Sequence, residues 1–144
     1  MLLTSLVANE KSNKDLAIHH FMQGEFLLNQ GNYALAVLEF QDALDIEPNA
    51  ATIHVSIADG YRRLGRPKRA ENHLEIAITL DSSDITAREM LGQLYLLNRK
   101  YKLAETQFLA LNKIDLTNDK YLSILGDLAK LQKEWNKSID FYVK

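Results

Sequence analysis

The sequence repeats itself at a fixed interval of 34 residues, and this interval limits the folds open to the chain. Small residues recur four times at that spacing, at Ala36, Ala70, Ala104 and Ser138. A large apolar or aromatic position keeps the same spacing, at Phe40, Leu74, Phe108 and Tyr142. A shared period in unlike residue types predicts one structural unit repeated about four times, in a solenoid rather than a globule with an enclosed active site.

Each unit carries the pattern of two helices. The first helix of the first unit has its core positions at spacings of three and four, at His20, Gln23, Gly24 and Leu27. Those spacings place the four residues on one helical face. Gly31 then provides a helix end, and Ala36, Phe40 and Ala43 mark a second helix. The sequence therefore predicts an all-α protein made of antiparallel helix hairpins.

Small residues on both helices indicate close packing inside each hairpin. They lie on the first helix at Gly24, Ala58, Gly92 and Gly126, and on the second in the alanine column described above. Small side chains let two helices approach while large neighbours fill the flanks. We expect bulky replacements in these columns to overpack the array.

Composition excludes several classes of function. The chain has 144 residues, of which 47% are hydrophobic and 25% charged, as in an ordinary globular protein. Its formal net charge of −2 provides no field that would attract nucleic acid or an anionic membrane. There is no cysteine, which excludes disulfides and thiolate chemistry.

These columns resemble the tetratricopeptide repeat (TPR) family. That family's unit is a 34-residue helical hairpin with Leu-Gly and Tyr on its first helix and Ala, an aromatic residue, Ala and Pro on its second. The match runs from about Ala17 to the end. His20 and His54 stand where the family favours tryptophan, Ala58 replaces glycine, and only Pro48 keeps the exit proline. The resemblance implies a right-handed superhelical solenoid.

The period divides the chain into a single TPR domain over residues 17–144. Repeat 1 covers 17–50, repeat 2 covers 51–84, repeat 3 covers 85–118, and a partial repeat 4 covers 119–144. Residues 1–16 form an N-terminal segment, expected to be a short helix or a frayed terminus. The apolar start, Met1 to Ala8, could also be the remnant of a signal sequence. We therefore expect a cytoplasmic protein, with an extracytoplasmic location as the alternative.

In this family the concave groove, lined by first helices, binds partners. The resemblance implies a peptide-binding groove made of Phe21, Glu25, Leu28, Asn29, Val55, Asp59, Arg62, Arg63, Glu89 and Gln93. It also places Ile18 and Thr52 on this surface. Apolar residues interleaved with acids and bases suit an extended peptide or an amphipathic helix. The expected function is a non-enzymatic scaffold that binds a peptide or helix of a partner protein during complex assembly.

One TPR subclass can be tested position by position. Repeats that grip the acidic C-terminal tails of chaperones use Lys, Asn and Arg as a two-carboxylate clamp. The matching positions here hold Phe21, Glu25, Ser56, Thr86 and Met90. Glu25 would repel a terminal carboxylate. We expect no chaperone-tail binding.

Neither catalysis nor cofactor binding is expected. The sequence lacks a phosphate-binding loop, a HExxH motif and a nucleophile elbow. His19 and His20 are adjacent and point to different faces, while His54 and His73 lie on different helices. We therefore predict no catalytic residue, no metal site, no cofactor, no bound nucleic acid and no membrane span.

The last repeat stops partway through its second helix. Ile139, Phe141, Tyr142 and Val143 provide no polar cap for the final exposed face. We expect either a fragment of a longer array, serving as a spacer, or an end buried by another molecule. The alternative to groove binding is thus an assembly element that homodimerises through its C-terminal end.

Overall fold

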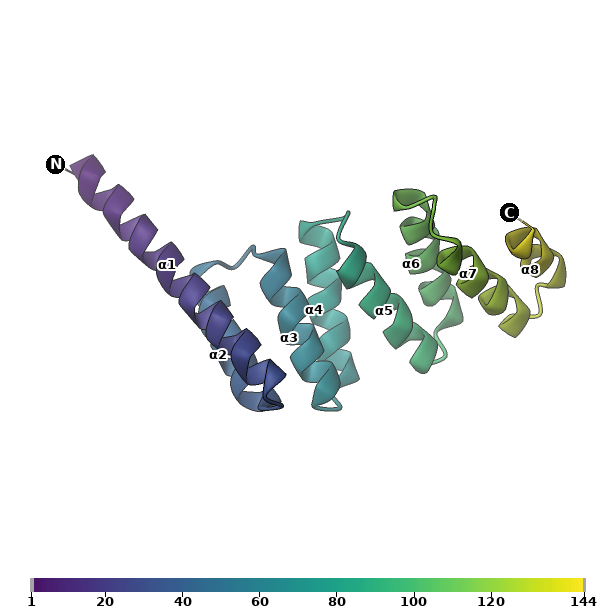
Figure 1. The fold of residues 1–144 in the computed structure, drawn as a ribbon, viewed down its shortest axis with the longest axis horizontal. Coiled ribbons are helices and arrows are strands. Elements are labelled where there is room, and N and C mark those ends of the chain that lie inside the picture. The colour runs from purple at the N-terminus through teal and green to yellow at the C-terminus, as the bar shows by residue number, and fades with distance from the viewer. Residues whose placement is uncertain (1, 144) are drawn as a thin grey trace. The chain divides into compact units, whose positions relative to one another are not determined.

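Paired helices fill the chain in the computed structural model, which describes the backbone of residues 2–143 and the side chains of residues 12–143. Contacts divide it into two units, Met1–Asp81 and Ser82–Lys144, called unit 1 and unit 2. Unit 1 holds α1 (Leu2–Asn29), α2 (Tyr33–Ile46), α3 (Ala51–Arg63) and α4 (Pro67–Leu80). Unit 2 holds α5 (Ile85–Leu97), α6 (Tyr101–Ile114), α7 (Asp119–Leu131) and α8 (Trp135–Tyr142). Figure 1 shows these elements in order along the chain.

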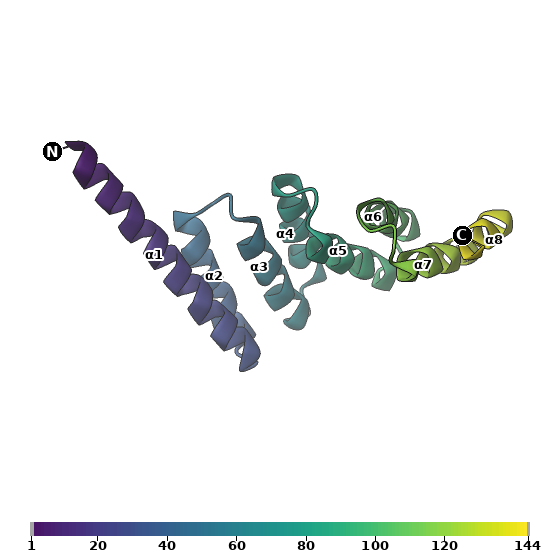
Figure 2. The same ribbon diagram turned by 45° about the horizontal axis from the view of Figure 1, so that its top comes forward.

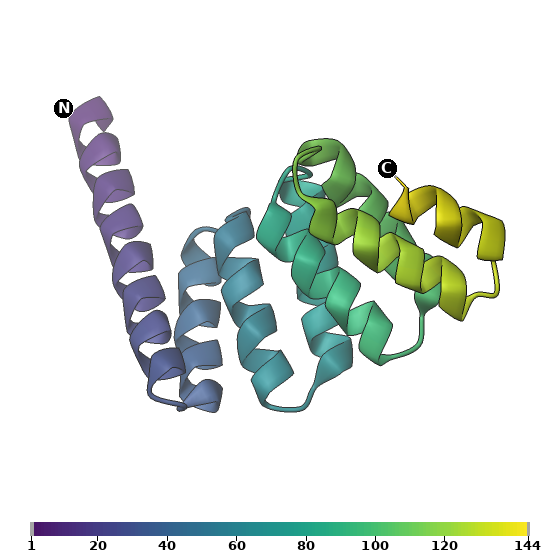
Figure 3. The same cartoon turned by 45° about the vertical axis from the view of Figure 1, so that its right-hand side comes forward.

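Each unit consists of two antiparallel hairpins. In unit 1, α1 lies along α2 and α3 along α4, and α3 also contacts α2 (Figure 2). In unit 2, α5 pairs with α6 and α7 with α8, and α7 also contacts α6 (Figure 3). No β-strand occurs within residues 2–143. The predicted all-α solenoid of 34-residue hairpins is confirmed.

The turn inside every hairpin uses one residue in the left-handed backbone region. Its φ is +83° at Gly31, +68° at Gly65, +57° at Arg99 and +61° at Lys133. The residue after each turn donates its backbone N–H to a carbonyl five residues earlier, for example Asn32 to Leu27 at 2.9 Å and Lys100 to Tyr95 at 2.8 Å. This is a Schellman ending, which satisfies carbonyls that the helix leaves free.

Within three hairpins, a glycine on the first helix faces an aromatic ring on the second. A Cβ added at Gly24 would lie 2.5 Å from the ring of Phe40, and one at Gly126 would lie 2.6 Å from Tyr142. Gly92 meets Phe108 in the same way, at 2.9 Å. The second hairpin has Ala58 where the others have glycine, and Leu74 where they have a ring. Because Leu74 is smaller than an aromatic residue, it leaves room for the methyl group of Ala58.

The first helix extends well beyond the repeat boundary expected from the sequence. α1 runs without interruption from Leu2 through residues 16 and 17 to Asn29, and its first turns extend beyond the end of α2 (Figure 1). Neither proline nor glycine occurs before Gly24, so no helix breaker separates the segment from the repeat. Met1, the first residue of the possible signal remnant, lies outside the described residues. No helix in the described part of the chain has the length and apolarity needed to cross a bilayer.

Candidate peptide-binding surface

The predicted groove residues lie on the first helices of the first three hairpins. α1 carries Phe21, Glu25, Leu28 and Asn29, and α3 carries Val55, Asp59, Arg62 and Arg63; both helices belong to unit 1. α5, in unit 2, carries Glu89 and Gln93. Asn29, Arg62, Arg63 and Gln93 are exposed, whereas Leu28 is buried. The buried Leu28 side chain reaches toward Gly60 of α3 and contributes to the repeat contact rather than to open surface.

A largely apolar pocket opens in unit 1 beside α1 and the start of α3. Its volume is about 350 Å³, and its lining is Lys14, Ala17, Ile18, Phe21, Glu47, Ala50, Thr52 and Ile53. Ile18 is half exposed, and Phe21 is part-buried with its ring 5.8 Å from that of Phe40. The pocket thus has a part-buried aromatic wall and an exposed aliphatic edge. The groove expected from the sequence consists of first helices alone. It therefore does not include Glu47 and Ala50, which lie in the link between α2 and α3.

Directly beside Phe21 on α1, a hydrogen bond joins the two first helices of unit 1. The Ser56 hydroxyl on α3 donates to Oε1 of Glu25 on α1 at 2.6 Å. The bond holds the carboxylate on this face and connects positions that are 31 residues apart in sequence. Glu25 therefore presents negative charge here, already oriented by an internal partner.

At the C-terminal end of α3, one carboxylate pairs with two guanidinium groups. Asp59 accepts hydrogen bonds from Nε of Arg62 at 3.0 Å and from Nε of Arg63 at 2.8 Å. Burial acts to raise the pKa of Asp59, but the hydrogen bonds from Arg63 and Arg62 outweigh it, so this pKa lies below its ordinary value. The Arg63 guanidinium also lies over the ring of Tyr33, 5.5 Å from its centroid. Asp59 thus offsets one of the two arginine charges, and the cluster keeps one net positive charge.

Unit 2 places Glu89 between its first helices. Tyr121 of α7 donates its hydroxyl to Oε1 of Glu89 at 3.0 Å, and Nζ of Lys120 lies 3.6 Å from the same oxygen. Burial, followed by this hydrogen bond, raises the pKa of Tyr121. Glu89 therefore connects α5 to α7, as Glu25 connects α1 to α3.

Three of the four histidines, His20, His54 and His73, lie at contacts between helices. Nδ1 of His54 and Nδ1 of His73 are 3.0 Å apart, linking α3 to α4. Burial is the main cause that lowers the pKa of each, and a repulsive effect of His54 adds to the shift at His73. His20 of α1 contacts Glu39 of α2, Nδ1 to Oε2, at 2.8 Å. Both pairs join the two helices of a single hairpin.

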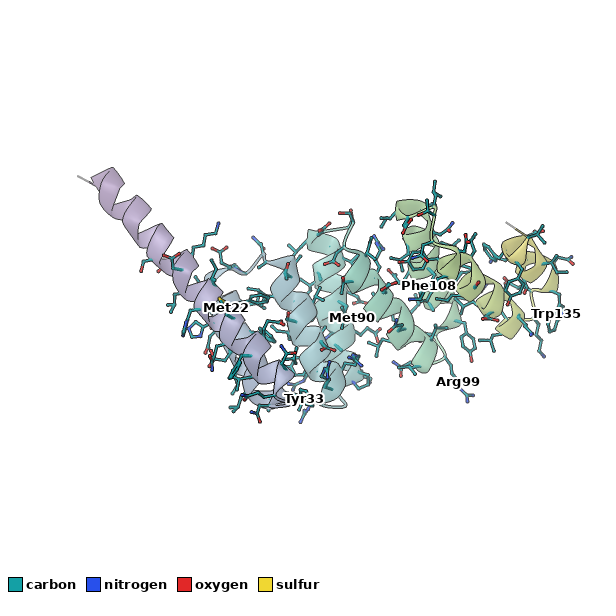
Figure 4. The ribbon with its side chains drawn as sticks, in the orientation of Figure 1. Met22, Tyr33, Met90, Arg99, Phe108 and Trp135 are labelled. Atoms are coloured by element: carbon teal, nitrogen blue, oxygen red, sulfur yellow. The ribbon has the colours of Figure 1, made fainter. Side chains whose placement is uncertain are left out.

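At the C-terminal end, one of the four residues expected to form an uncapped apolar face, Tyr142, packs within the last hairpin. Tyr142 packs its ring on Gly126 and donates its hydroxyl to Asp127 at 2.7 Å, so it belongs to the last hairpin. The exposed apolar stripe instead consists of Trp135 (59% exposed), Ile139 (59%) and Val143 (80%). These residues are spaced by four and share one face. Trp135 is labelled at the start of α8 in Figure 4.

Stacked hairpins with open first-helix surfaces define an α-helical repeat protein. The chain belongs to the tetratricopeptide repeat family, whose model matches residues 3–51 and 55–115. Membership agrees with the columns described above. The fold of this family is in general a non-catalytic scaffold that supports protein–protein interaction.

Solved structures show the same fold. The first TPR of Spaghetti (RPAP3), bound to the HSP90 peptide SRMEEVD, matches with a TM-score of 0.76 and 19% identity, over 83% of this chain and 95% of that one. A MamA protein matches with a TM-score of 0.80 and 18% identity, over 89% of this chain and 70% of that one. PilF of Pseudomonas aeruginosa matches with a TM-score of 0.73 and 20% identity, over 93% of this chain and 60% of that one.

A curated protein shares a shorter segment. A protein O-mannosyl-transferase of Caenorhabditis elegans is 29% identical over 75 residues, which is 52% of this chain and 11% of that protein. The chain therefore matches only a small part of that relative's length. The matched segment corresponds in size to about two repeats.

Proposed function

We propose that this chain is a non-enzymatic interaction scaffold whose first-helix surface binds a peptide or helix of a partner protein during complex assembly. The observation that carries the proposal is the pocket of about 350 Å³ in unit 1. Its apolar walls at Ile18 and Phe21 suit a large apolar side chain, and Lys14 and Glu47 at its margin offer both signs of charge. Peptide recognition commonly combines such anchors with charge contacts.

The neighbouring polar contacts favour the same use. Glu25, held by Ser56, lies on the first-helix face of α1 that also carries Phe21. The Glu25 carboxylate is already held in place by Ser56. Binding of a hydrogen-bond donor from the ligand would therefore cost little entropy for ordering the Glu25 side chain. A partner segment with an apolar anchor followed by a basic or hydroxyl side chain fits this surface.

Site-specific photo-cross-linking tests the proposal. A photoreactive residue at Ile18 or Thr52, both exposed at the pocket, should cross-link the partner in cells. The matched control is Leu38, an exposed apolar residue on α2 that does not line the pocket. Equal cross-linking from Leu38, or none from the pocket positions, would contradict the proposal.

We infer that acidic chaperone tails are not the ligand. The Spaghetti (RPAP3) structure contains an HSP90 peptide, but the corresponding positions here hold no cationic residue. In unit 1 they hold Phe21, Glu25 and Ser56, and the last two bond to each other. In unit 2 they hold Thr86 and Met90. Fluorescence anisotropy with SRMEEVD should show no saturable binding at micromolar protein, and micromolar affinity would refute this inference.

A second candidate function is homodimerisation through the C-terminal end. It is favoured by the stripe of Trp135, Ile139 and Val143, because one exposed apolar face is typical of an interface. Ile139→Asp should abolish a dimer detected by analytical ultracentrifugation, whereas Ile18→Glu should leave it intact. A monomeric wild-type chain at high concentration would exclude this candidate.

A further inference from the structure

Three metal-ligating side chains meet in the first hairpin, on a side not used by the pocket. His20 projects from α1, while Glu39 and Asp42 project from α2. One ligand atom from each residue can be chosen so that all three lie within 4.8 Å of one another. His20 and Glu39 are part-buried and Asp42 is exposed, so the cluster has two anchored ligands and an open side.

The repeat period explains why two of these residues meet. Positions equivalent to His20 and Glu39 are His54 and His73 in the second hairpin, 3.0 Å apart, and Arg88 and Gln107 in the third, 3.1 Å apart. Contact between these positions is therefore a regular feature of the hairpin. A contact of this kind by itself needs no ligand.

The third residue is specific to the first hairpin. Asp42 lies three residues after Glu39, so both carboxylates share one face of α2. The equivalent positions in the next hairpins are Ile76 and Ala110, which cannot bind a metal ion. Only here does the regular contact carry an imidazole and two carboxylates.

From this geometry we propose that His20, Glu39 and Asp42 form a binding site for a divalent transition-metal ion such as Zn²⁺. Zn²⁺ accepts imidazole nitrogen and carboxylate oxygen, with three protein ligands and one open position as a common arrangement. Two carboxylates match the 2+ charge of the ion. Within the part of the chain that the structure describes, no lysine or arginine forms an ion pair with Glu39 or Asp42.

Small side-chain movements complete the site. Bonds of about 2.1 Å place the ligand atoms of a tetrahedral zinc ion about 3.4 Å apart. His20 and Glu39 are already closer than this, at 2.8 Å, and would separate around the ion. The exposed Asp42 side chain has room to close. The bound ion would connect α1 to α2 and stabilise the folded hairpin.

Calorimetric titration of Zn²⁺ into the chelator-treated full chain tests the site. We expect one equivalent to bind and the thermal midpoint to rise. His20→Gln and Asp42→Asn each remove one ligand with little change in size. Each should weaken binding at least tenfold, since even loss of an outer-shell partner costs about 10–100-fold.

Two matched controls separate this site from adventitious histidine binding. His19→Gln changes an exposed neighbour of His20, and His73→Gln removes the histidine pair of the second hairpin. Both should retain wild-type affinity. Absence of binding, equal binding in Asp42→Asn, or loss of binding in either control would overturn the assignment. Far-UV circular dichroism of each variant verifies that the helices are intact.

Discussion

Consecutive repeats meet through different chemistry in the two units. In unit 1, Val37 of α2 is 5% exposed and faces Gly60 of α3, where an added Cβ would lie 2.6 Å from Cγ2 of Val37. The equivalent position in unit 2 is Glu105 of α6, 6% exposed, which accepts hydrogen bonds from Lys137 and from Gln132. Val37 and Glu105 hold the same place in the repeat and are both buried, and the local sequence decides whether an apolar contact or an ion pair fills that place.

The largest effect is expected where the apolar contact is tightest. Gly60→Leu would drive its side chain into Val37, and overpacking of this kind costs about 1–3 kcal/mol. Urea unfolding followed by circular dichroism would measure the loss. Thr52→Leu, an exposed change on the same helix, is the control and should have little effect. Val37→Ala in the Gly60→Leu background should restore part of the stability, and failure to do so would contradict this packing.

The ion pair of unit 2 should respond less to truncation. Glu105→Ala removes the acceptor of Lys137 and Gln132, and we expect a loss of about 1–2 kcal/mol, since water reaches the half-exposed lysine. The raised pKa of Lys137 should also fall, because its main cause is the hydrogen bond to Glu105, while Glu134 still acts to raise it.

A double variant shows whether unit 2 depends on charge. Glu105→Leu with Lys137→Met replaces the pair by apolar residues, and such replacements are often neutral or stabilising. Unfolding free energies should then return to within about 1 kcal/mol of wild type. A larger deficit in the double variant than in Glu105→Ala would show that the pair itself is required.

This contrast also shows what the sequence could predict. The hairpins and the close approach of their helices at small residues such as Gly24 and Ala36 followed from the period, because sterics leave few residue types for such positions. That the ring of Phe40 is what faces Gly24 came from the structure. The burial of Glu105 did not follow, because its partner Lys137 lies 32 residues away and its residue type indicates solvent. The Glu25–Ser56 bond and the closeness of Asp42 to His20 likewise depend on side-chain conformations at positions without a family preference.

The units should also differ in their response to acid. Burial lowers the pKa of His54 and His73 below 6.5, so under mildly acidic conditions the unfolded chain binds more protons than the folded one. The free energy of unfolding should therefore fall as pH drops below about 6.5, by at most about 1.4 kcal/mol per pH unit for each histidine. Well above that pH both histidines are neutral in both states, and their contribution is constant.

Unit 2 supplies the control for this pH effect. Its equivalent pair contains no histidine: Nη1 of Arg88 donates to Oε1 of Gln107 at 3.1 Å. The double variant His54→Arg with His73→Gln transfers that pair into unit 1. Its unfolding free energy, measured by urea titration across this pH range, should fall less steeply than that of wild type. Equal slopes would exclude the His54–His73 pair as the source.

The smallest difference lies in the hairpin turns, where unit 1 has Gly31 and Gly65 but unit 2 has Arg99 and Lys133 (Figure 4 labels Arg99). All four have positive φ. A left-handed conformation costs a non-glycine residue roughly 1–2 kcal/mol, and the larger unfolded-state entropy of glycine offsets about 0.5–1 kcal/mol of that. Arg99→Gly and Lys133→Gly should thus each stabilise the chain by about 0.5–1 kcal/mol.

Reversing the exchange completes this test. Gly31→Arg, at φ +83°, should destabilise unit 1 by a similar amount, because the turn geometry is shared and only the residue differs. The two glycine substitutions lie in separate turns, so their effects on the urea midpoint should add. Arg99→Gly lowers the urea midpoint only if the arginine side chain stabilises its turn by more than the backbone strain costs. That outcome would contradict the assumption that the four turns differ only in backbone strain.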